Sequence, residues 1–168
     1  MSRYCLITGA SSGLGRELAI QYAEQGWQVI AVARSVNALN ELQNQHKSIH
    51  AFPLDLTNTE LFSAAVEQLS QQIPALDLVI LNAGSCDYVD VTQLPLDIFD
   101  RTMALNFQAQ VAAVKLLLPL LQKSADATLA IVSSLAHLFP FTKAQAYGAS
   151  KAALSYFADS LRVDLTGS

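Results

Sequence analysis

The sequence has few charged residues, few cysteines and no concentration of positive charge. Charged residues make up 14% of its 168 residues, and the net charge is −4. It lacks a basic run and a stripe of basic and aromatic residues, so nucleic-acid binding is not expected. The two cysteines, Cys5 and Cys86, belong to no ligand-spaced pair, so neither a metal site nor a disulfide framework is predicted. Cys5 lies in an apolar run and is expected to be a buried small hydrophobe in a reducing compartment.

Long hydrophobic runs are also missing. The apolar run near the N-terminus meets Thr8 and Gly9 too soon to form the core of a signal peptide. The longest apolar tract, residues 111–121, contains Lys115 and Pro119 and is expected not to span a bilayer. We therefore expect a cytoplasmic protein without a membrane partner.

Short apolar runs alternate with longer segments of helical periodicity. Asp97 is a candidate N-cap for the longest helix. The expected strands are 4–8, 27–33, 49–54, 76–81 and 128–133, and the expected helices are 14–25, 36–45, 61–73, 99–121 and 147–165. Strands that are apolar on both faces and separated by helices predict an α/β fold, with a doubly wound parallel sheet between two helical layers. We expect one domain over residues 1–168.

The first expected strand runs directly into a glycine-rich turn, which a helix follows. The turn reads Thr8-Gly9-Ala10-Ser11-Ser12-Gly13-Leu14-Gly15. A dinucleotide site needs glycine for a tight turn, for close approach of a pyrophosphate and for close packing of helix on strand. The N-terminus of the helix would supply amide donors for the phosphates. The pattern predicts a dinucleotide site, and the alternative is an ordinary strand-to-helix turn.

The residue after the second strand bears on the type of cofactor. NAD-binding proteins place an acidic residue roughly 20 positions past the glycines, where it binds the ribose hydroxyls. No Asp or Glu occurs between Val29 and Asn40, and Arg34 follows the strand instead. Because arginine can bind a 2′-phosphate, NADP(H) is favoured over NAD(H). The alternative is that Arg34 is a solvated loop residue.

A second group of polar residues follows the later strands. Tyr147 and Lys151 are four residues apart and share one face of the last helix. Such a pair alone is common and usually lies exposed on a helix. Here Asn82-Ala83-Gly84 follows the fourth strand, Ser134 follows the fifth, and Asn106 lies early in the long helix. Ligands of open α/β sheets bind at the carboxyl ends of the strands, so these groups are expected to converge on one crevice.

With these residues the sequence resembles the classical short-chain dehydrogenase/reductase family. The glycine turn is similar to the TGxxxGxG turn of that family, and Asn82-Ala83-Gly84 to its NAG motif. Asp55, followed by Leu56, matches the aspartate beside the adenine ring. The resemblance covers essentially the whole chain and implies a Rossmann fold. The family's catalytic tetrad matches Asn106, Ser134, Tyr147 and Lys151 in order and spacing.

The resemblance implies an oxidoreductase that transfers hydride between a nicotinamide cofactor and a small alcohol or carbonyl compound. Tyr147 would exchange a proton with the substrate oxygen as general acid/base. Lys151 would bind the nicotinamide ribose and lower the pKa of Tyr147. Ser134 would hydrogen-bond the substrate oxygen, and its offset from Tyr147 favours it over Ser133. Asn106 would kink its helix and hold a water linked to Lys151. The implied cofactor-binding residues are Gly9, Ser11, Ser12, Gly13, Leu14, Gly15, Arg34, Asp55, Leu56, Asn82, Ala83, Gly84, Tyr147 and Lys151.

The family also implies contacts between subunits. Its members pair through helices that correspond to residues near 99–121 and 147–165, so a homodimer or homotetramer is expected. The alternative is that the apolar residues of these helices only cover the sheet. Phe139 and Phe141 are candidates for lining a substrate pocket, and packing alone is an equal alternative.

Family members usually continue well beyond the catalytic helix, whereas this sequence ends at Thr166-Gly167-Ser168. The sixth and seventh family strands and the segment that closes over the substrate are therefore expected to be missing. The chain could be naturally short or a fragment. A non-catalytic dinucleotide-binding module, an inactive fragment and a fragment that folds with a partner subunit stay open as alternatives. The edge of the fifth strand would be left unpaired or would pair with another chain.

Overall fold

The computed structural model describes residues 2–165, so Met1 and the final Thr166-Gly167-Ser168 lie outside the described residues. The chain divides into two compact units. The first, here called the sheet unit, comprises Met1–Ala83 and Ala112–Val132. The second, here called the helix unit, comprises Gly84–Val111 and Ser133–Ser168. Each unit is described by itself, and one domain over 1–168 stays a prediction.

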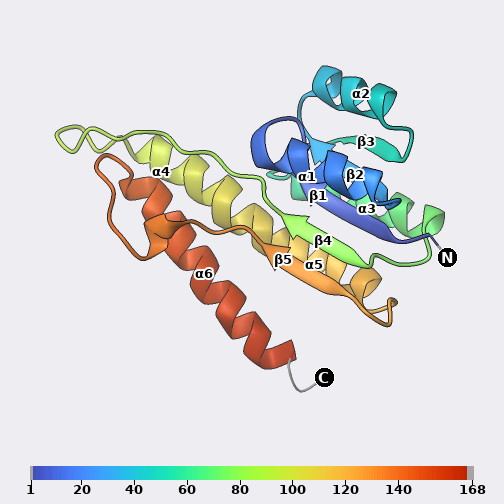
Figure 1. Cartoon of the computed structure of the whole chain (residues 1–168). Helices are drawn as coiled ribbons and strands as arrows, with labels where there is room; N and C mark the ends of the chain where they lie inside the picture. The colour runs from blue at the N-terminus through green and yellow to red at the C-terminus, as the bar shows by residue number, and fades with distance from the viewer. Residues whose placement is uncertain (1, 166–168) are drawn as a thin grey trace. The chain divides into compact units, whose positions relative to one another are not determined.

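Five parallel strands form the centre of the sheet unit (Figure 1). Their order across the sheet is β3-β2-β1-β4-β5, which leaves β3 and β5 at the two edges. This order confirms the predicted doubly wound α/β fold, because the chain changes direction across the sheet between β1 and β4. The strands are β1 (Tyr4–Thr8), β2 (Gln28–Ala33), β3 (Ile49–Pro53), β4 (Leu78–Leu81) and β5 (Thr128–Ile131).

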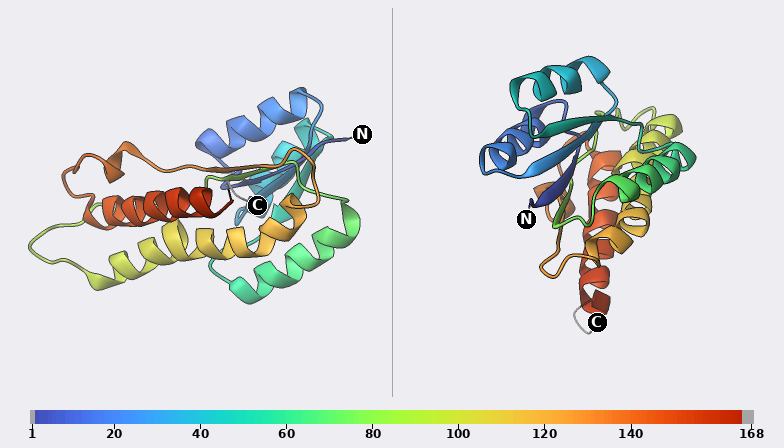
Figure 2. Two further views of the ribbon diagram at one scale, coloured as in Figure 1. Left: turned by 90° about the horizontal axis from the view of Figure 1, so that it is seen from below. Right: turned by 90° about the vertical axis from the view of Figure 1, so that its right-hand side faces the viewer.

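Strand pleating sorts the apolar residues of the sheet unit onto two faces. Cys5, Ile7, Val29 and Ala31 belong to one buried cluster together with residues of α1 and α2. Figure 2 shows α1 on one face of the sheet and α3 on the opposite face. Burial on both faces explains why the strands are apolar without alternation. The helices that lie wholly within this unit are α1 (Gly13–Glu24), α2 (Val36–Gln45) and α3 (Thr59–Gln72).

The helix ends in the sheet unit follow from local chemistry. The Ser35 hydroxyl accepts a hydrogen bond from the Ala38 N–H and caps α2, and Asn58 caps α3 in the same way. Gly26, with a φ of +85°, follows the end of α1 in a conformation that favours glycine. Because these signals are local, the predicted bounds of the three helices lie within two residues of the observed ones.

The helix predicted over 99–121 is divided by a π-helical turn, which contains Asn106, the residue for which the resemblance implies a kink. α4 (Leu96–Met103) passes into the π-helical segment η1 (Ala104–Gln108), and α5 (Ala109–Leu121) follows. The Ala109 N–H bonds to the Ala104 carbonyl five residues back, which accommodates one extra residue in the turn. Asp97 is not the N-cap, since Pro95 holds that position. The Asp97 carboxylate lies in the first turn, where the helix dipole favours negative charge.

Two further helices complete the helix unit. The single turn η2 (Leu135–His137) begins directly after Ser134, and α6 (Gln145–Leu165) carries Tyr147 and Lys151. Within this unit α6 packs against α4, η1 and η2. These contacts place the residues expected to be catalytic on neighbouring elements.

The apolar tract at 111–121 is part of a longer helical run than the sequence indicated. The run Leu96–Leu121 has 26 residues and is long and apolar enough to cross a membrane by length and composition alone. The core helix of a soluble protein passes the same test, and Leu117 and Leu120 are buried within the fold. Length and composition therefore do not assign this run to a membrane.

Candidate active site

The glycine-rich turn of the sheet unit is packed too tightly for side chains at two positions. A Cβ atom at Gly15 would lie 2.4 Å from the Gly9 carbonyl oxygen and 2.6 Å from Asn82 Nδ2. A Cβ atom at Gly9 would lie 2.9 Å from Asn82 Nδ2, and Gly9 has a φ of +70°. These two glycines therefore let α1 approach the ends of β1 and β4 closely.

The third glycine, Gly13, has open space where the others are crowded. No atom lies within 4 Å of a Cβ built at Gly13, which has a φ of +53°. Ser12 is the N-cap of α1, but its side chain makes no capping hydrogen bond, and the first turn holds no acidic residue. The amides at this helix end thus face an uncapped, uncrowded space. That arrangement fits the diphosphate of a dinucleotide, for which Gly13, Leu14 and Gly15 could supply donors.

Thr8 connects the glycine turn to the end of β4. Its fully buried hydroxyl accepts hydrogen bonds from the Asn82 and Ala83 backbone amides, at 2.9 and 3.0 Å. The Asn82 side chain donates in return to the Thr8 carbonyl at 3.1 Å. These reciprocal bonds hold the ends of β1 and β4 together at the point where the strand order reverses. They explain why an asparagine follows β4 in this fold.

Arg34 and Asp55 lie close enough to influence each other electrostatically. The backbone N–H and hydroxyl of Thr57 bond to Asp55 Oδ1 at 2.9 and 2.7 Å. These hydrogen bonds are the main cause that lowers the pKa of Asp55, and the charge of Arg34 contributes to a lesser degree. Both Arg34 and Asp55 are exposed, whereas Leu56 is buried. An exposed guanidinium at the end of β2 is available to a phosphate ligand.

In the helix unit, Asn106 is the centre of a buried hydrogen-bond network. It lies in the π-helical segment and is fully buried. Its Oδ1 accepts from the Ser85 amide at 2.9 Å, and its Nδ2 donates to the Ser85 carbonyl at 2.8 Å. Nδ2 also donates to the Ser150 hydroxyl at 3.0 Å. Ser150 in turn donates to the Tyr147 carbonyl at 2.7 Å, so the network reaches α6.

Tyr147 and Lys151 lie one turn apart on α6. The Lys151 Nζ is 5.9 Å from the centre of the Tyr147 ring. The lysine is 3% exposed, and this burial lowers its pKa because desolvation disfavours the charged form. A Cβ atom at Gly84 would lie 3.6 Å from Lys151 Nζ and 3.2 Å from Asn106 Oδ1. Because Gly84 has no side chain, it adds no atoms beside Lys151 Nζ and Asn106 Oδ1.

Adjacent serines after β5 take different roles. The Ser133 hydroxyl lies 2.5 Å from the Ser155 hydroxyl and donates to the Lys151 carbonyl at 3.4 Å, so it fastens α6. The Ser134 hydroxyl caps η2 by accepting from the Ala136 amide at 3.1 Å. Acting as an acceptor there leaves the Ser134 proton available to a ligand. The choice of Ser134 over Ser133 as the catalytic serine stays a prediction.

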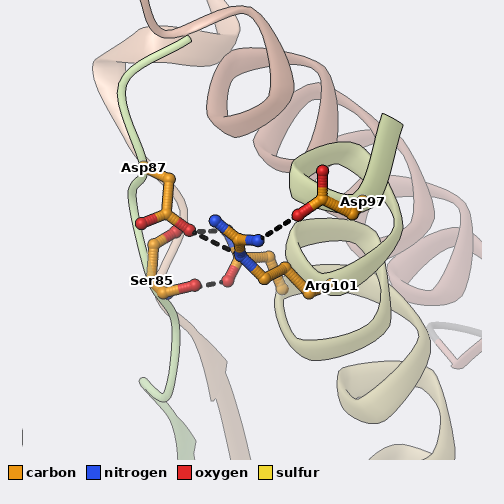
Figure 3. Close-up of polar contacts among 5 residues, drawn as sticks. Ser85, Asp87, Asp97 and Arg101 are labelled. Atoms are coloured by element: carbon orange, nitrogen blue, oxygen red, sulfur yellow. Dashed lines mark hydrogen bonds and ion pairs between the residues drawn. The ribbon is translucent and has the colours of Figure 1, made fainter. Parts of the chain in front are cut away.

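The loop that follows β4 is attached to α4 by a charged residue. Arg101 forms ion pairs with Asp87 at 3.1 Å and with Asp97 at 2.6 Å, all three side chains being exposed (Figure 3). Ser85 lies in the same loop, where its backbone is bound by Asn106. Exposed ion pairs stabilise weakly, so the partly buried hydrogen bonds between Asn106 and the Ser85 backbone are the stronger attachment of this loop.

Phe139 and Phe141 line a cavity of about 350 Å³, but this cavity is not formed around Tyr147. Its wall on α6 consists of Gln145, Gly148, Ala149 and Ala152. Successive helix residues advance by about 100°, so this wall lies on the side of α6 away from Tyr147 and Lys151. A role for the two phenylalanines in lining the substrate pocket stays a prediction.

The sequence model of the family described as short chain dehydrogenase matches residues 3–168. The chain belongs to this family of short-chain dehydrogenases. The match extends over both units, and the order of elements and sheet topology agree with it. It confirms the resemblance and the fold that the sequence motifs predicted.

Several relatives resemble this short-chain dehydrogenase over almost its whole length. An uncharacterised oxidoreductase of Myxococcus xanthus is 35% identical over 98% of this chain and 67% of its own. A fatty acyl-CoA reductase of Acinetobacter baylyi is 37% identical over 97% of this chain and 57% of its own. Among solved structures, the RhlG/NADP complex of Pseudomonas aeruginosa has a TM-score of 0.90 and 29% identity, covering 98% of this chain and 68% of its own.

A short-chain dehydrogenase of Escherichia coli complexed with NADPH has a TM-score of 0.89 and 29% identity, over 96% of this chain and 71% of its own. The chain spans about half to two thirds of the length of the curated relatives described above and of the mouse dehydrogenase/reductase SDR family member 7, which is 30% identical. The family and the fold are thereby established, and the reaction is a separate question.

The structure brings the predicted site residues together in two groups. In the sheet unit, Gly9, Gly15, Asn82 and Ala83 are in mutual contact around Thr8. In the helix unit, Asn106 is linked to the α6 turn that carries Tyr147 and Lys151. Convergence of the two groups on one crevice stays a prediction.

Sequence reasoning missed the connecting residues of both groups, namely Thr8, Ser85 and Ser150. Each is a small polar residue that the fold places among buried neighbours. The position of Ser150 three residues after Tyr147, on a helix that is mostly apolar, was a signal that could have been used.

Proposed function

We propose that this short-chain dehydrogenase transfers hydride between NADP(H) and a small alcohol or carbonyl compound, with Tyr147 as the general acid/base. The observation that carries the proposal is the burial of Lys151 beside the Tyr147 ring, with the lysine pKa lowered by desolvation. An ammonium group beside a phenol stabilises the phenolate, and this interaction is stronger in a buried site than in water.

The proton chemistry belongs to three side chains of the helix unit. When bound, the nicotinamide group supplies or accepts the hydride. In the reductive direction the Tyr147 hydroxyl gives its proton to the substrate oxygen, and the positive charge of Lys151 stabilises the phenolate that remains. Ser134 donates a hydrogen bond to the same oxygen and fixes its position. In the oxidative direction the phenolate takes the proton back.

The cofactor would be held mainly by backbone groups of the sheet unit. The open end of α1 around Gly13 fits the diphosphate, and Arg34 supplies the positive charge for a 2′-phosphate. The NADPH and NADP complexes of the two similar structures support this assignment. Asp55 and Leu56 would lie beside the adenine, and Asn82, Ala83 and Gly84 would support the nicotinamide half.

Cofactor preference can be tested by titrating the chain with NADPH and with NADH in a calorimeter. NADPH should bind clearly more tightly. Arg34→Ala should weaken NADPH binding by about tenfold, or roughly 1.4 kcal/mol, and leave NADH binding within twofold. Equal affinity for the two cofactors, unaffected by Arg34→Ala, would assign Arg34 to the solvated surface and remove the NADP preference.

The catalytic part of the proposal is tested on Tyr147 itself. Turnover of a panel of aldehydes and ketones with NADPH should fall at least a thousandfold in Tyr147→Phe, while NADPH affinity stays within threefold. Tyr156→Phe is the matched control, because it removes a hydroxyl from another tyrosine of the same helix and keeps the aromatic ring. If wild type and Tyr147→Phe bind NADPH equally and neither turns over any compound, the non-catalytic binding module is the correct function.

The substrate is not specified by the relatives. Their names refer to a fatty acyl-CoA, to sulfoacetaldehyde and to serine, at 31–37% identity to this chain. These compounds differ in size and charge but share a carbonyl or alcohol carbon. The proposal is therefore limited to that functional group.

We also propose that the chain forms a homodimer or homotetramer through the helices near 99–121 and 147–165. Tyr156 and Val163 on α6 are 80% and 72% exposed and would be covered in such an assembly. The apolar cavity beside Gly148 and Ala152 lies on the same helix. Light scattering after size exclusion should give a mass of two or four chains, and Tyr156→Glu should reduce it. A monomer at all concentrations would refute the assembly.

A further inference from the structure

Ser150 occupies a junction in the buried network of the helix unit. Its side chain is fully buried, and its hydroxyl lies between the Asn106 Nδ2 and the Tyr147 carbonyl oxygen. A hydroxyl has one proton and can accept as well as donate. Because a carbonyl can only accept, Ser150 gives its proton to Tyr147 and must accept from Asn106. The directions of both hydrogen bonds are thus fixed by chemistry.

The directions of the hydrogen bonds between Asn106 and the Ser85 backbone are also fixed by chemistry. The Ser85 amide can only donate and the Ser85 carbonyl can only accept, so Asn106 Oδ1 faces the first and Nδ2 the second. One Nδ2 proton goes to the Ser85 carbonyl, and the other goes to Ser150. The carboxamide therefore uses both of its protons, with Ser150 as the link to α6.

We propose that Ser150 is a positioning residue, which joins the turn of α6 that carries Tyr147 and Lys151 to Asn106 and, through it, to the Gly84–Ser85 backbone. The effect on catalysis rests on the proposed function, whereas the mechanical link does not. Ser150 contacts no reacting atom in this role. It fixes the position of the Tyr147 turn relative to the Gly84 backbone. Lys151 Nζ lies beside that backbone.

The chain provides a comparison within the same helix. Ser155 also attaches α6 through a hydroxyl, at 2.5 Å from the Ser133 hydroxyl, but it makes no contact in the network of Asn106. Ser155→Ala therefore removes one hydroxyl attachment of α6 and spares the Asn106 network. Any effect found for Ser150→Ala and absent from Ser155→Ala belongs to the network and not to helix attachment in general.

The link can be measured without substrate, by hydrogen exchange of the Ser85 amide in the chain alone. Ser150→Ala leaves one buried Asn106 N–H without an acceptor, which loosens the carboxamide that holds the Ser85 amide. Exchange of that amide should accelerate at least tenfold, corresponding to about 1.4 kcal/mol, while exchange of the Leu6 amide in β1 stays unchanged. Ser150→Thr keeps the hydroxyl and should restore slow exchange. Exchange within twofold of wild type in Ser150→Ala would overturn the proposal.

Turnover provides the second measurement. In Ser150→Ala, kcat should fall at least tenfold while KM and the NADPH dissociation constant stay within threefold, because only the placement of the Tyr147 turn changes. Combining Ser150→Ala with Asn106→Ala should add little to Asn106→Ala alone, since both break one link. If the fold-losses in kcat of the two single variants multiplied in the double variant, Ser150 and Asn106 would act independently, which would refute the proposed link. Absence of turnover in wild type, with the exchange result as expected, would count against the proposed function and leave the link standing.

Discussion

The side chain of Asn106 pairs with both backbone polar groups of Ser85, at 2.9 Å from the amide and 2.8 Å from the carbonyl. A carboxamide offers the same donor and acceptor as a peptide group, so it can complete the backbone of a loop that has no strand partner. Asn106 reaches this position from a π-helical turn, where the extra residue changes the direction in which the side chain points. The Asn106 side chain therefore fixes the backbone of the loop after β4 at Ser85.

Asn106→Asp keeps the shape of the side chain but replaces a donor with an acceptor. The new oxygen would face the Ser85 carbonyl oxygen, and a carboxylate would be buried where a neutral carboxamide stood. We expect the free energy of unfolding at neutral pH to fall by on the order of 3 kcal/mol. Burial would raise the pKa of the introduced carboxyl, so the loss should diminish as the pH falls and the group is protonated. Urea denaturation of wild type and variant from about pH 4 to pH 8 checks both points. A loss that is independent of pH would contradict the assigned orientation.

The glycines of the turn should separate folding from cofactor binding. Gly15→Ala places a Cβ atom 2.4 Å from the Gly9 carbonyl and should destabilise the chain by on the order of 3 kcal/mol. Gly13→Ala meets no neighbour, so its cost is the left-handed backbone alone, about 1 kcal/mol. Its methyl group enters the space assigned to the diphosphate, and NADPH affinity should fall at least tenfold. Urea denaturation and calorimetry measure the two effects.

Gly26→Ala is the control for Gly13→Ala. Gly26 also has a positive φ and open space, but it lies at the other end of α1. It should cost a similar amount of stability and leave NADPH affinity unchanged. Equal loss of affinity in the two variants would refute the assignment of the diphosphate to the N-terminus of α1.

The burial of Lys151 should appear in the pH dependence of stability. Its pKa in the folded chain is below the usual 10.5, because desolvation disfavours the ammonium form. At a pH between the pKa of Lys151 in the folded chain and its pKa in the unfolded chain, the unfolded chain binds more protons. The free energy of unfolding should therefore rise with pH over that range. Urea denaturation from about pH 7 to pH 10 should show this rise in wild type and a smaller one in Lys151→Met. Lys115→Met, at an exposed lysine of α5, is the matched control. Identical slopes in wild type and Lys151→Met would place Lys151 in solvent.

The two cysteines should differ sharply in reactivity. Cys5 is fully buried in β1, and burial raises the pKa of its thiol to about 12. Cys86 is exposed, although partial desolvation and the charge of Asp87 raise its pKa as well. With a disulfide reagent at about pH 8, one thiol per chain should react in the native state and the second only after unfolding. Cys86→Ser should remove the fast reaction. Two fast thiols in wild type would contradict the burial of β1.

The sequence predicted the elements well where their signals are local. All five strands and the helices α1, α2, α3 and α6 lie within two residues of the expected positions, because apolar periodicity and capping residues act over short distances. The division of the long helix at Asn106 was not predicted as a π turn. In that turn Asn106 pairs with Ser85 and Ser150, which are 21 and 44 residues distant in sequence. Periodicity within one helix carries no information on such partners.

In the candidate site, too, short local patterns could be predicted from the sequence, and contacts between distant residues could not. The glycine turn and the Tyr147–Lys151 spacing were readable because each is a short pattern with a stated chemistry. The sequence by itself thus determined the family, the α/β fold and the residues to consider. Only the tertiary structure decided that Ser133 attaches α6 while Ser134 caps η2, that Phe139 and Phe141 line a cavity on the side of α6 away from Tyr147, and that Ser150 joins Asn106 to Tyr147. Those roles depend on which buried donors and acceptors meet, and folding alone sets that arrangement.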